Sequence, residues 1–220
     1  MGKKKITFHS ERTDLDLLKP VPTSRVMPEW FRLMPGSVEG IETVKKCVPV
    51  LDALTAGYII PISADAYWDK ESGRFVSAFV DKLDSDHMKQ QTSFVEIPDN
   101  FDPQPHKWIN RWFIKTPKGY STLFIHPLNR QDLPFRSFSG IVDTDKHPMP
   151  VNFPFILEKD FEGMIPAGTP MIQAIPFKRD DWESLVIDTG DSYFYPYSSD
   201  NMNPPFAWYK RKWWTRKLYS

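Results

Sequence analysis

The chain has 220 residues, and its 28 Lys and Arg balance its 28 Asp and Glu, which does not indicate a basic nucleic-acid binder. Its 21 prolines exclude long helices, because an internal proline removes a helical hydrogen bond, while 40% hydrophobic residues can build a core. A single cysteine excludes an internal disulfide, and no apolar run could span a membrane, so we expect a soluble, cytoplasmic protein without a membrane partner.

Residues 1–36 have the composition of an extended, proline-rich arm. Four prolines lie between positions 20 and 35, which favours extended or polyproline-like chain. Within the arm, Ile6–Phe8 predicts a short strand, and Pro28–Leu33 predicts one helical turn that starts at its proline. The apolar residues of the arm indicate that it lies on the body of the protein or on a neighbouring subunit.

We expect a β domain over residues 37–185, beginning with its most helical segment. Apolar spacing predicts a helix over 37–46 and a second helical turn at 50–54. Residues 57–62 and 75–80 then read as two strands, and the turn at 70–73 favours their pairing as a hairpin. Residues 81–107 are polar and proline-rich, which indicates a surface insertion, with one short strand at 93–97.

The next part of the chain is cut by Pro and Gly at nearly regular intervals. Short strands are predicted at 112–115, 121–126, 137–142, 151–157, 163–165 and 170–176. Such spacing indicates a mainly β fold, such as a small distorted β-barrel or a sandwich. Residues 186–220 form an aromatic and basic tail, in which 208–217 predicts a short C-terminal helix.

A family resemblance rests on three elements that occur in the family's order. Gly140-Ile141-Val142-Asp143-Thr144-Asp145 resembles the Gly-Val-Ile-Asp-x-Asp motif of the dUTPase and dCTP-deaminase superfamily, whose fold is the β-clip. Ile165–Gln173 resembles its Gly-x-x-Ile-Ala-Gln element, and Thr55–Ile59 resembles its Ala-Gly-Tyr-Asp element, so the resemblance covers residues 56–179. The chain is also similar to a family seen in phage and bacterial genomes, for which no activity is known.

Asp143 and Asp145 are the candidate catalytic residues. At positions i and i+2 of a strand their side chains point to one face, where paired carboxylates suit a general base with a polar anchor, or a divalent metal. The resemblance implies that Asp143 contacts the sugar and activates water. The alternative is structural, since Asp-Thr-Asp-Lys also favours a turn in which Asp side chains bond nearby backbone N–H groups.

Two histidines, His126 and His147, are the candidate metal ligands. With one carboxylate they would form a site of two His and one Asp. Their spacing matches no compact ligand motif, so His126 is alternatively a hydrogen-bonded core residue and His147 a solvated loop residue.

The candidate ligand-binding residues are Asn129, Arg130, Lys118 and Tyr58. Arginine reads phosphate with a bidentate fork, and Lys118 lies in a turn whose backbone amides add donors. The alternative for Arg130 is a surface ion pair with Asp132, and Tyr58 is first of all a core or pocket-wall residue.

These candidates support three functions. The first is a dUTPase-like protein, encoded by a phage, that binds or hydrolyses a (deoxy)nucleotide, with Mg²⁺ as companion because it bridges phosphates. The second is a metal-dependent enzyme with His and Asp ligands. The third is a non-catalytic binding or assembly module. A small anionic ligand and a homo-oligomer, such as a trimer joined through the arm or the tail, are the expected partners.

Overall fold

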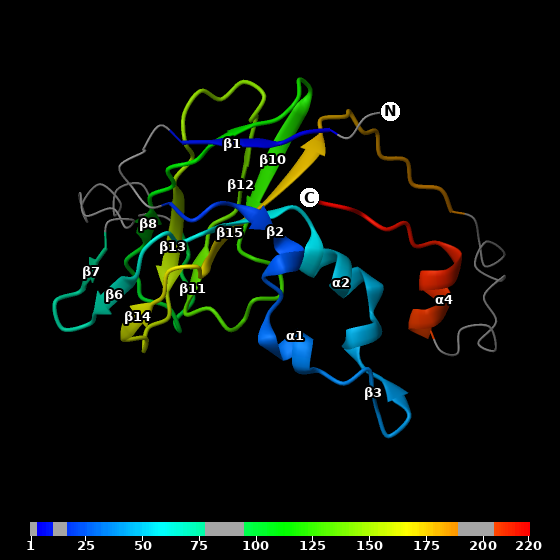
Figure 1. Ribbon diagram of the computed structural model, residues 1–220, viewed down its shortest axis with the longest axis horizontal. Coiled ribbons are helices and arrows are strands. Elements are labelled where there is room, and N and C mark those ends of the chain that lie inside the picture. Colours follow the sequence, from blue (N-terminus) through cyan, green and yellow to red (C-terminus); the bar gives the residue numbers. More distant parts are fainter. Residues whose placement is uncertain (1–3, 11–16, 78–94, 189–204) are drawn as a thin grey trace.

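A computed structural model describes residues 4–10, 17–77, 95–188 and 205–220 of the chain (Figure 1). The protein is mainly β, with 33% strand and 13% helix, which confirms the predicted fold class. The strands of the described residues form several open sheets, and none of these sheets closes into a barrel. No helix in these ranges has the length and apolarity needed to cross a membrane.

The N-terminal part of the chain pairs with strands of the β domain at two points. Strand β1 (Thr7–His9) pairs with β9 (Phe113–Lys115), and β2 (Val21–Pro22) pairs with β5 (Tyr58–Pro61). The remaining elements of this part are η1 (Thr23–Arg25), α1 (Glu29–Leu33), β3 (Ser37–Val38), β4 (Ile41–Glu42), η2 (Val44–Lys46) and α2 (Val48–Thr55). The predicted helical turns at 28–33 and 50–54 correspond to α1 and α2, and α2 begins with Pro49 in its first turn.

The helix predicted over 37–46 is wrong. These residues form the hairpin β3–β4 followed by the 3-10 turn η2. Glu39 and Gly40 both have positive φ angles, 50° and 81°, which is the backbone of a two-residue hairpin turn and cannot continue a right-handed helix. The apolar residues of this segment have a spacing that fits either a helix or a hairpin followed by a turn. The segment is too short for its hydrophobic period to distinguish the two.

The central sheet is antiparallel, with strand order β12-β10-β15-β5-β2. Its longest strand, β15 (Pro170–Lys178), pairs with β10 (Tyr120–Ile125) from Tyr120↔Lys178 to Ile125↔Gln173. On its other side β10 pairs with β12 (Gly140–Val142). Because both neighbours run antiparallel to β10, the start of β10 and the ends of β12 and β15 lie together at one end of the sheet.

The predicted pairing of the strands at 57–62 and 75–80 is wrong, and two smaller sheets show the observed arrangement. One has the order β11-β13-β8, and the other has the order β14-β6-β7. Their strands are β11 (Phe135–Ser137), β13 (Phe153–Leu157), β8 (His106–Trp108), β14 (Gly163–Ile165), β6 (Ala66–Asp69) and β7 (Arg74–Val76). The turn at 70–73 does join a hairpin, but its first strand is β6, while β5 pairs with β15 and β2.

Other boundaries also differ from those predicted. The strand expected at 137–142 is two strands, because Ser137 ends β11 and the chain then changes sheet to form β12. Residues 95–97 carry no strand, and β8 lies inside the expected insertion. Most of that insertion, the end of the strand expected at 75–80 and part of the tail lie outside the described residues. The C-terminal helix is α4 (Pro205–Lys212).

The core combines aliphatic side chains with a cluster of aromatic rings. Trp108 is fully buried and stacks on Phe155 with a centroid distance of 4.0 Å, and both rings contact Phe135 edge-on. His106 lies in the same cluster, with its ring 4.9 Å from that of Trp68 and 5.2 Å from that of Phe75. Burial lowers the pKa of His106 from 6.5 to about 4.

The buried His106 predicts a loss of stability in mild acid. Because the folded state holds this imidazole neutral, its contribution is fully present above pH 6.5 and is lost as pH falls towards 4. The shift corresponds to about 3 kcal/mol. We expect His106→Phe, which suits the aromatic surroundings, to remove this part of the pH dependence. Urea unfolding at pH 7.5 and 4.5 measures the free energy of unfolding of the native protein and of the variant. If both proteins lost the same free energy of unfolding between these pH values, His106 would not be the cause of the loss.

Candidate functional site

The sheet topology brings four polar side chains together at one end of the central sheet. Ser121 lies at the start of β10, Asp143 and Asp145 follow the end of β12, and Arg179 follows the end of β15. The two aspartates predicted as a pair therefore do form one cluster, but its centre is Arg179, which the sequence did not single out.

Arg179 binds Asp145 with both arms of its guanidinium. Nη1 donates to Oδ1 at 2.9 Å and Nη2 donates to Oδ2 at 2.5 Å, while the backbone N–H of Gly119 also donates to Oδ2, at 2.8 Å. The Asp145 side chain is only 4% exposed. The hydrogen bonds from Arg179 hold the pKa of Asp145 well below its usual value, so this carboxylate stays ionised. It is an anchor that ties three chain segments together.

Asp143 is the more accessible of the two carboxylates. Its Oδ1 accepts a hydrogen bond from the Ser121 hydroxyl at 2.7 Å and lies 3.1 Å from Nη1 of Arg179. Its side chain is 48% exposed. Of the two interpretations of this pair, the strand is wrong, because β12 ends at Val142. Asp143 begins a turn, in which its backbone carbonyl accepts from the N–H of Lys146. The turn alternative therefore describes the backbone, while both side chains contact distant segments.

Removal of the Arg179 charge is expected to destabilise the protein at neutral pH. Arg179→Met leaves Asp145 charged, enclosed and without its main partner, which is costly. In the native protein the depressed pKa of Asp145 gives stability that is present above about pH 4 and is lost below it. In the variant, the free energy of unfolding should therefore fall less steeply than in the native protein as the pH is lowered below about 4.

Lys178→Met is the matched control for this substitution. Lys178 is the preceding residue and pairs with Asp180 at the surface, where ion pairs contribute little. Urea unfolding between pH 3 and 7 compares the two variants. Equal midpoints for both variants at pH 7 would contradict the anchoring role of Arg179.

Arg130, Asn129 and His126 form a second cluster, which hydrogen bonds join to other parts of the protein. Nε and Nη2 of Arg130 donate to Asp132 at 2.8 and 2.7 Å, which confirms the ion pair weighed as the alternative. The carbonyl of Asn129 accepts from the indole of Trp30 at 3.2 Å. His126 is enclosed between the carbonyl of Arg130 and the N–H of Ser137, and burial lowers its pKa. These contacts hold α1 and its flanking chain on the body.

His147 lies in the turn that follows Asp145. Its Nδ1 lies 2.8 Å from the carbonyl oxygen of Met149, and its own carbonyl accepts from Lys115 at 3.0 Å. Within the described ranges, no group of three or more His, Cys, Asp or Glu side chains is arranged to hold a metal ion. The structure thus does not bring His126 and His147 into one such group.

Tyr58 contacts two of the residues that line a cavity of about 360 Å³, here called the tail cavity, and Lys118 follows the lining residue Pro117 in the chain. Its lining comes from the residues before β1, the turn before β10, the first residue of β10, β15 and the C-terminal tail: Lys4, Lys5, Ile6, Thr116, Pro117, Tyr120, Pro176, Leu218, Tyr219 and Ser220. Lys118 is exposed in the turn between Pro117 and Tyr120. The ring of Tyr58 contacts that of Tyr219 at 6.0 Å, and its hydroxyl lies 3.4 Å from the carbonyl oxygen of Ser220.

The chemistry of this lining is mixed. Lys4 and Lys5 are among the lining residues and no Asp or Glu is, so the side-chain charge of the lining favours an anion. Nζ of Lys4 lies 5.8 Å from the centre of the Tyr120 ring. Tyr120 and Tyr219 add aromatic surface, and Thr116 adds a hydroxyl. A ligand with an anionic end and a flat apolar body matches such a lining.

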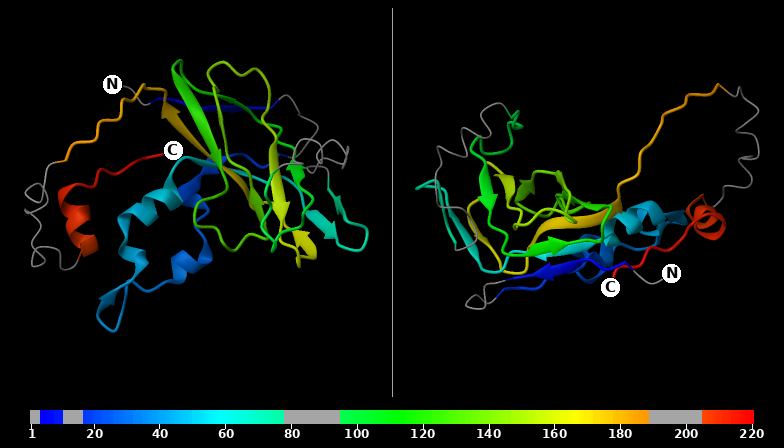
Figure 2. Two further views of the ribbon diagram at one scale, coloured as in Figure 1. Left: turned by 180° about the vertical axis from the view of Figure 1, so that it is seen from behind. Right: turned by 90° about the horizontal axis from the view of Figure 1, so that it is seen from above.

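Asp52 of α2 holds the tail wall of the cavity in place. Its two carboxylate oxygens accept from the indole Nε1 of Trp214 at 3.1 and 3.0 Å, and Lys217 donates to one of them at 2.6 Å. Figure 2 shows the red end of the chain beside the dark blue segment that begins β1. Asp52 is thus a positioning residue that joins segments far apart in the sequence.

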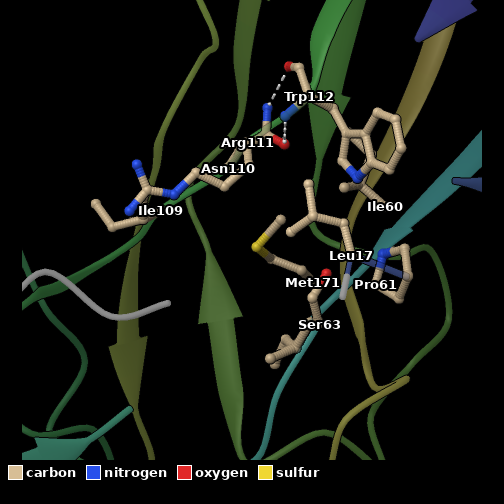
Figure 3. A pocket seen from close by; sticks show the side chains of 10 residues that line it. Leu17, Ile60, Pro61, Ser63, Ile109, Asn110, Arg111, Trp112 and Met171 are labelled. Atoms are coloured by element: carbon tan, nitrogen blue, oxygen red, sulfur yellow. Dashed lines mark hydrogen bonds between the residues drawn. The ribbon is translucent and has the colours of Figure 1, made fainter. Parts of the chain in front are cut away.

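Other hollows in the described structure fit a small anion less well. The one in Figure 3, lined by Leu17, Ile60 and Met171 among others, has a volume of about 10 Å³, enough for a single water molecule. On its rim the Asn110 side chain bonds the backbone N–H and carbonyl of Trp112 (Figure 3). A hollow of about 570 Å³ beside Arg130 is larger, but Asp132 neutralises that guanidinium.

Sequence reasoning missed Arg179, Asp52 and Lys4 as contributors to these sites. Arg179 and Asp52 act on partners that lie 34 or more residues away, and no local spacing reveals such a contact. The lysine run at residues 3–5 was visible, but nothing placed it beside Tyr120. Comparisons with protein-family models, with curated proteins and with solved structures found no match, so the resemblance to dUTPases stays a prediction.

Proposed function

We propose that the protein binds a small organic anion in the tail cavity, and that the ligand is a (deoxy)nucleotide. The observation that carries the proposal is the pairing of Lys4 and Lys5 with Tyr120 and Tyr219 around one cavity of about 360 Å³. Its volume is within the range of small-molecule sites, roughly 300–1,000 Å³. A cavity lined by lysine and tyrosine side chains is the simplest match to the expected anionic ligand.

The lining suggests how a nucleotide would be held. The phosphates would contact the lysine ammonium groups, with Lys118 in the adjacent turn as a further cation. The base would stack on a tyrosine ring, since every base offers a π-face. Thr116 would be a wall residue and not a donor to the ligand, because its hydroxyl donates to the carbonyl of Tyr120 at 3.0 Å and also bonds the Thr144 hydroxyl at 2.8 Å.

Hydrolysis is a further step, which the dUTPase resemblance predicts. Asp143 would be the group that activates water, because it is 48% exposed, whereas Asp145 is 4% exposed and held by Arg179. The aspartates offer a poor protein site for Mg²⁺, since the Arg179 guanidinium already occupies the cation position between them. We therefore propose that any Mg²⁺ arrives bound to the phosphates.

A thermal-shift panel tests the proposal. Deoxynucleoside triphosphates, monophosphates and nucleosides are compared at millimolar concentration, each with and without Mg²⁺. A ligand present at 100 times its Kd stabilises the folded state by about 2.7 kcal/mol. We expect the phosphorylated compounds to raise the melting temperature and the nucleosides to do so less. No shift with any nucleotide would reject the proposal, and a shift without phosphate release would limit it to binding.

A further inference from the structure

The segment that follows Arg179 exposes an unusual amount of apolar surface. Between residues 180 and 188, Trp182 is 90% exposed and Val186 is 92% exposed, and Leu185 and Ile187 are 79% and 66% exposed. We call residues 180–188 the docking arm. Single exposed apolar residues are ordinary, but four large ones within six positions form the kind of patch that marks an interaction site.

The docking arm is also acidic. Its sequence, Asp-Asp-Trp-Glu-Ser-Leu-Val-Ile-Asp, has four acidic residues and no basic one. Asp180 pairs with Lys178, while Asp181 and Glu183 are exposed. Figure 2 shows this stretch, in gold, leaving the end of β15 and running away from the sheets. It carries no helix or strand of its own.

The complementary surface lies in the C-terminal tail of the same chain. Residues 209–218 contain five basic residues and no acidic one. Lys210, Lys212 and Arg216 are exposed, and Trp213 is 51% exposed, so apolar and basic groups lie side by side here too. We call these four residues the basic tail face. Asp52 holds the neighbouring Trp214 and Lys217 on the body, which presents the face on a fixed support.

We propose that the docking arm of one molecule binds the basic tail face of a second copy of this chain. Both halves of a charge-complementary, partly aromatic contact are present in a single sequence, which favours a homo-oligomer over an unrelated partner. If two molecules each bind the other's tail face, the resulting dimer contains the contact twice. If each molecule instead binds the next one head to tail, the molecules form a ring. Complementary charges orient the two surfaces, and burial of the apolar side chains supplies most of the affinity.

Charge reversal with rescue tests the contact directly. Asp181→Lys with Glu183→Lys reverses the arm, Lys210→Glu with Lys212→Glu reverses the tail face, and the quadruple variant restores opposite signs. Analytical ultracentrifugation of the full chain measures the dissociation constant of each protein. We expect each double reversal to raise it roughly tenfold or more, and the quadruple variant to recover most of that loss.

A second pair of variants tests the apolar part and the specificity. Trp182→Ser with Val186→Ser should dissociate the oligomer, while Glu71→Lys with Glu162→Lys, two exposed acids outside the docking arm, should leave it unchanged. A native chain that is monomeric at every concentration would overturn the proposal. So would an oligomer that withstands the arm variants, or a quadruple variant that does not recover. None of these outcomes bears on nucleotide binding, which is measured separately.

Discussion

Gly57→Ala is expected to be the most damaging Gly→Ala substitution among the glycines that the structure describes. Gly57 has a φ of 65°, and a Cβ atom at this position would lie 2.1 Å from the carbonyl oxygen of Ala174 in β15. The obstacle is the backbone of the central sheet, which cannot rotate away as a side chain can. We expect a loss of about 4 kcal/mol or more, at the upper end of point-mutant effects.

Gly73→Ala separates the two causes of this loss. Gly73 has the same φ of 65°, but nothing lies within 4 Å of its added Cβ. It should therefore show only the left-handed backbone cost, roughly 1–2 kcal/mol. Urea unfolding followed by circular dichroism compares the two proteins. If the two losses were equal, the close approach of β5 and β15 at Gly57 would not be what requires a glycine.

Gln173→Leu is expected to have the second large effect. Gln173 is fully buried in β15, and its Nε2 donates to the carbonyls of Ala53 and Ala56 at 3.1 and 2.7 Å. Its Oε1 accepts from the N–H of Leu128 at 2.8 Å. Leucine has a similar volume but leaves the N–H of Leu128 and the carbonyl of Ala53 without this partner, while the carbonyl of Ala56 keeps its hydrogen bond from the Thr23 hydroxyl. At about 1–3 kcal/mol for each buried unsatisfied group, we expect a loss of about 2–6 kcal/mol.

Gln104→Leu is the control for Gln173. The Gln104 side chain makes no hydrogen bond within the described structure and is partly exposed, so its replacement should change the unfolding free energy by about 0.5 kcal/mol or less. Guanidinium unfolding at neutral pH measures both variants. A Gln173 variant as stable as its control would show that these three contacts do not hold α2 and the 127–128 turn to the sheet.

The β content was predictable because it depends on local signals. Proline and glycine punctuation located most strands between residues 112 and 178, and the Gly140–Asp145 and Ala167–Gln173 elements fall on β12 and β15. The failures concern pairing and short windows. Strand β6 was missed, so β5 was paired with the wrong partner, and the Glu39–Gly40 turn was hidden within a helix-like apolar spacing. Pairing depends on contacts distant in sequence, which period and composition do not encode.

The candidate site shows the same division. The Arg130–Asp132 ion pair, two residues apart, was visible as an alternative and is confirmed. The hydrogen bonds between Arg179 and Asp145 join residues 34 positions apart, and the sequence did not indicate them. Tyr58 and Lys118 were proposed for their chemistry, but neither is among the residues that line the tail cavity, although Tyr58 contacts its lining residues Tyr219 and Ser220. Local ion pairs can thus be read from sequence, whereas shared cavities need the topology.

Calorimetric titration of a deoxynucleoside triphosphate is the most direct test of binding in the tail cavity. The native protein is compared with Lys4→Gln/Lys5→Gln and with Lys19→Gln/Lys159→Gln, which removes two exposed lysines outside the cavity lining. Each lost phosphate contact to a charged group weakens binding by about 1.5–3 kcal/mol, or roughly ten- to a hundredfold. We predict that weakening for the cavity variant and an unchanged Kd for the control. Equal affinity in all three proteins would contradict ligand binding in the tail cavity.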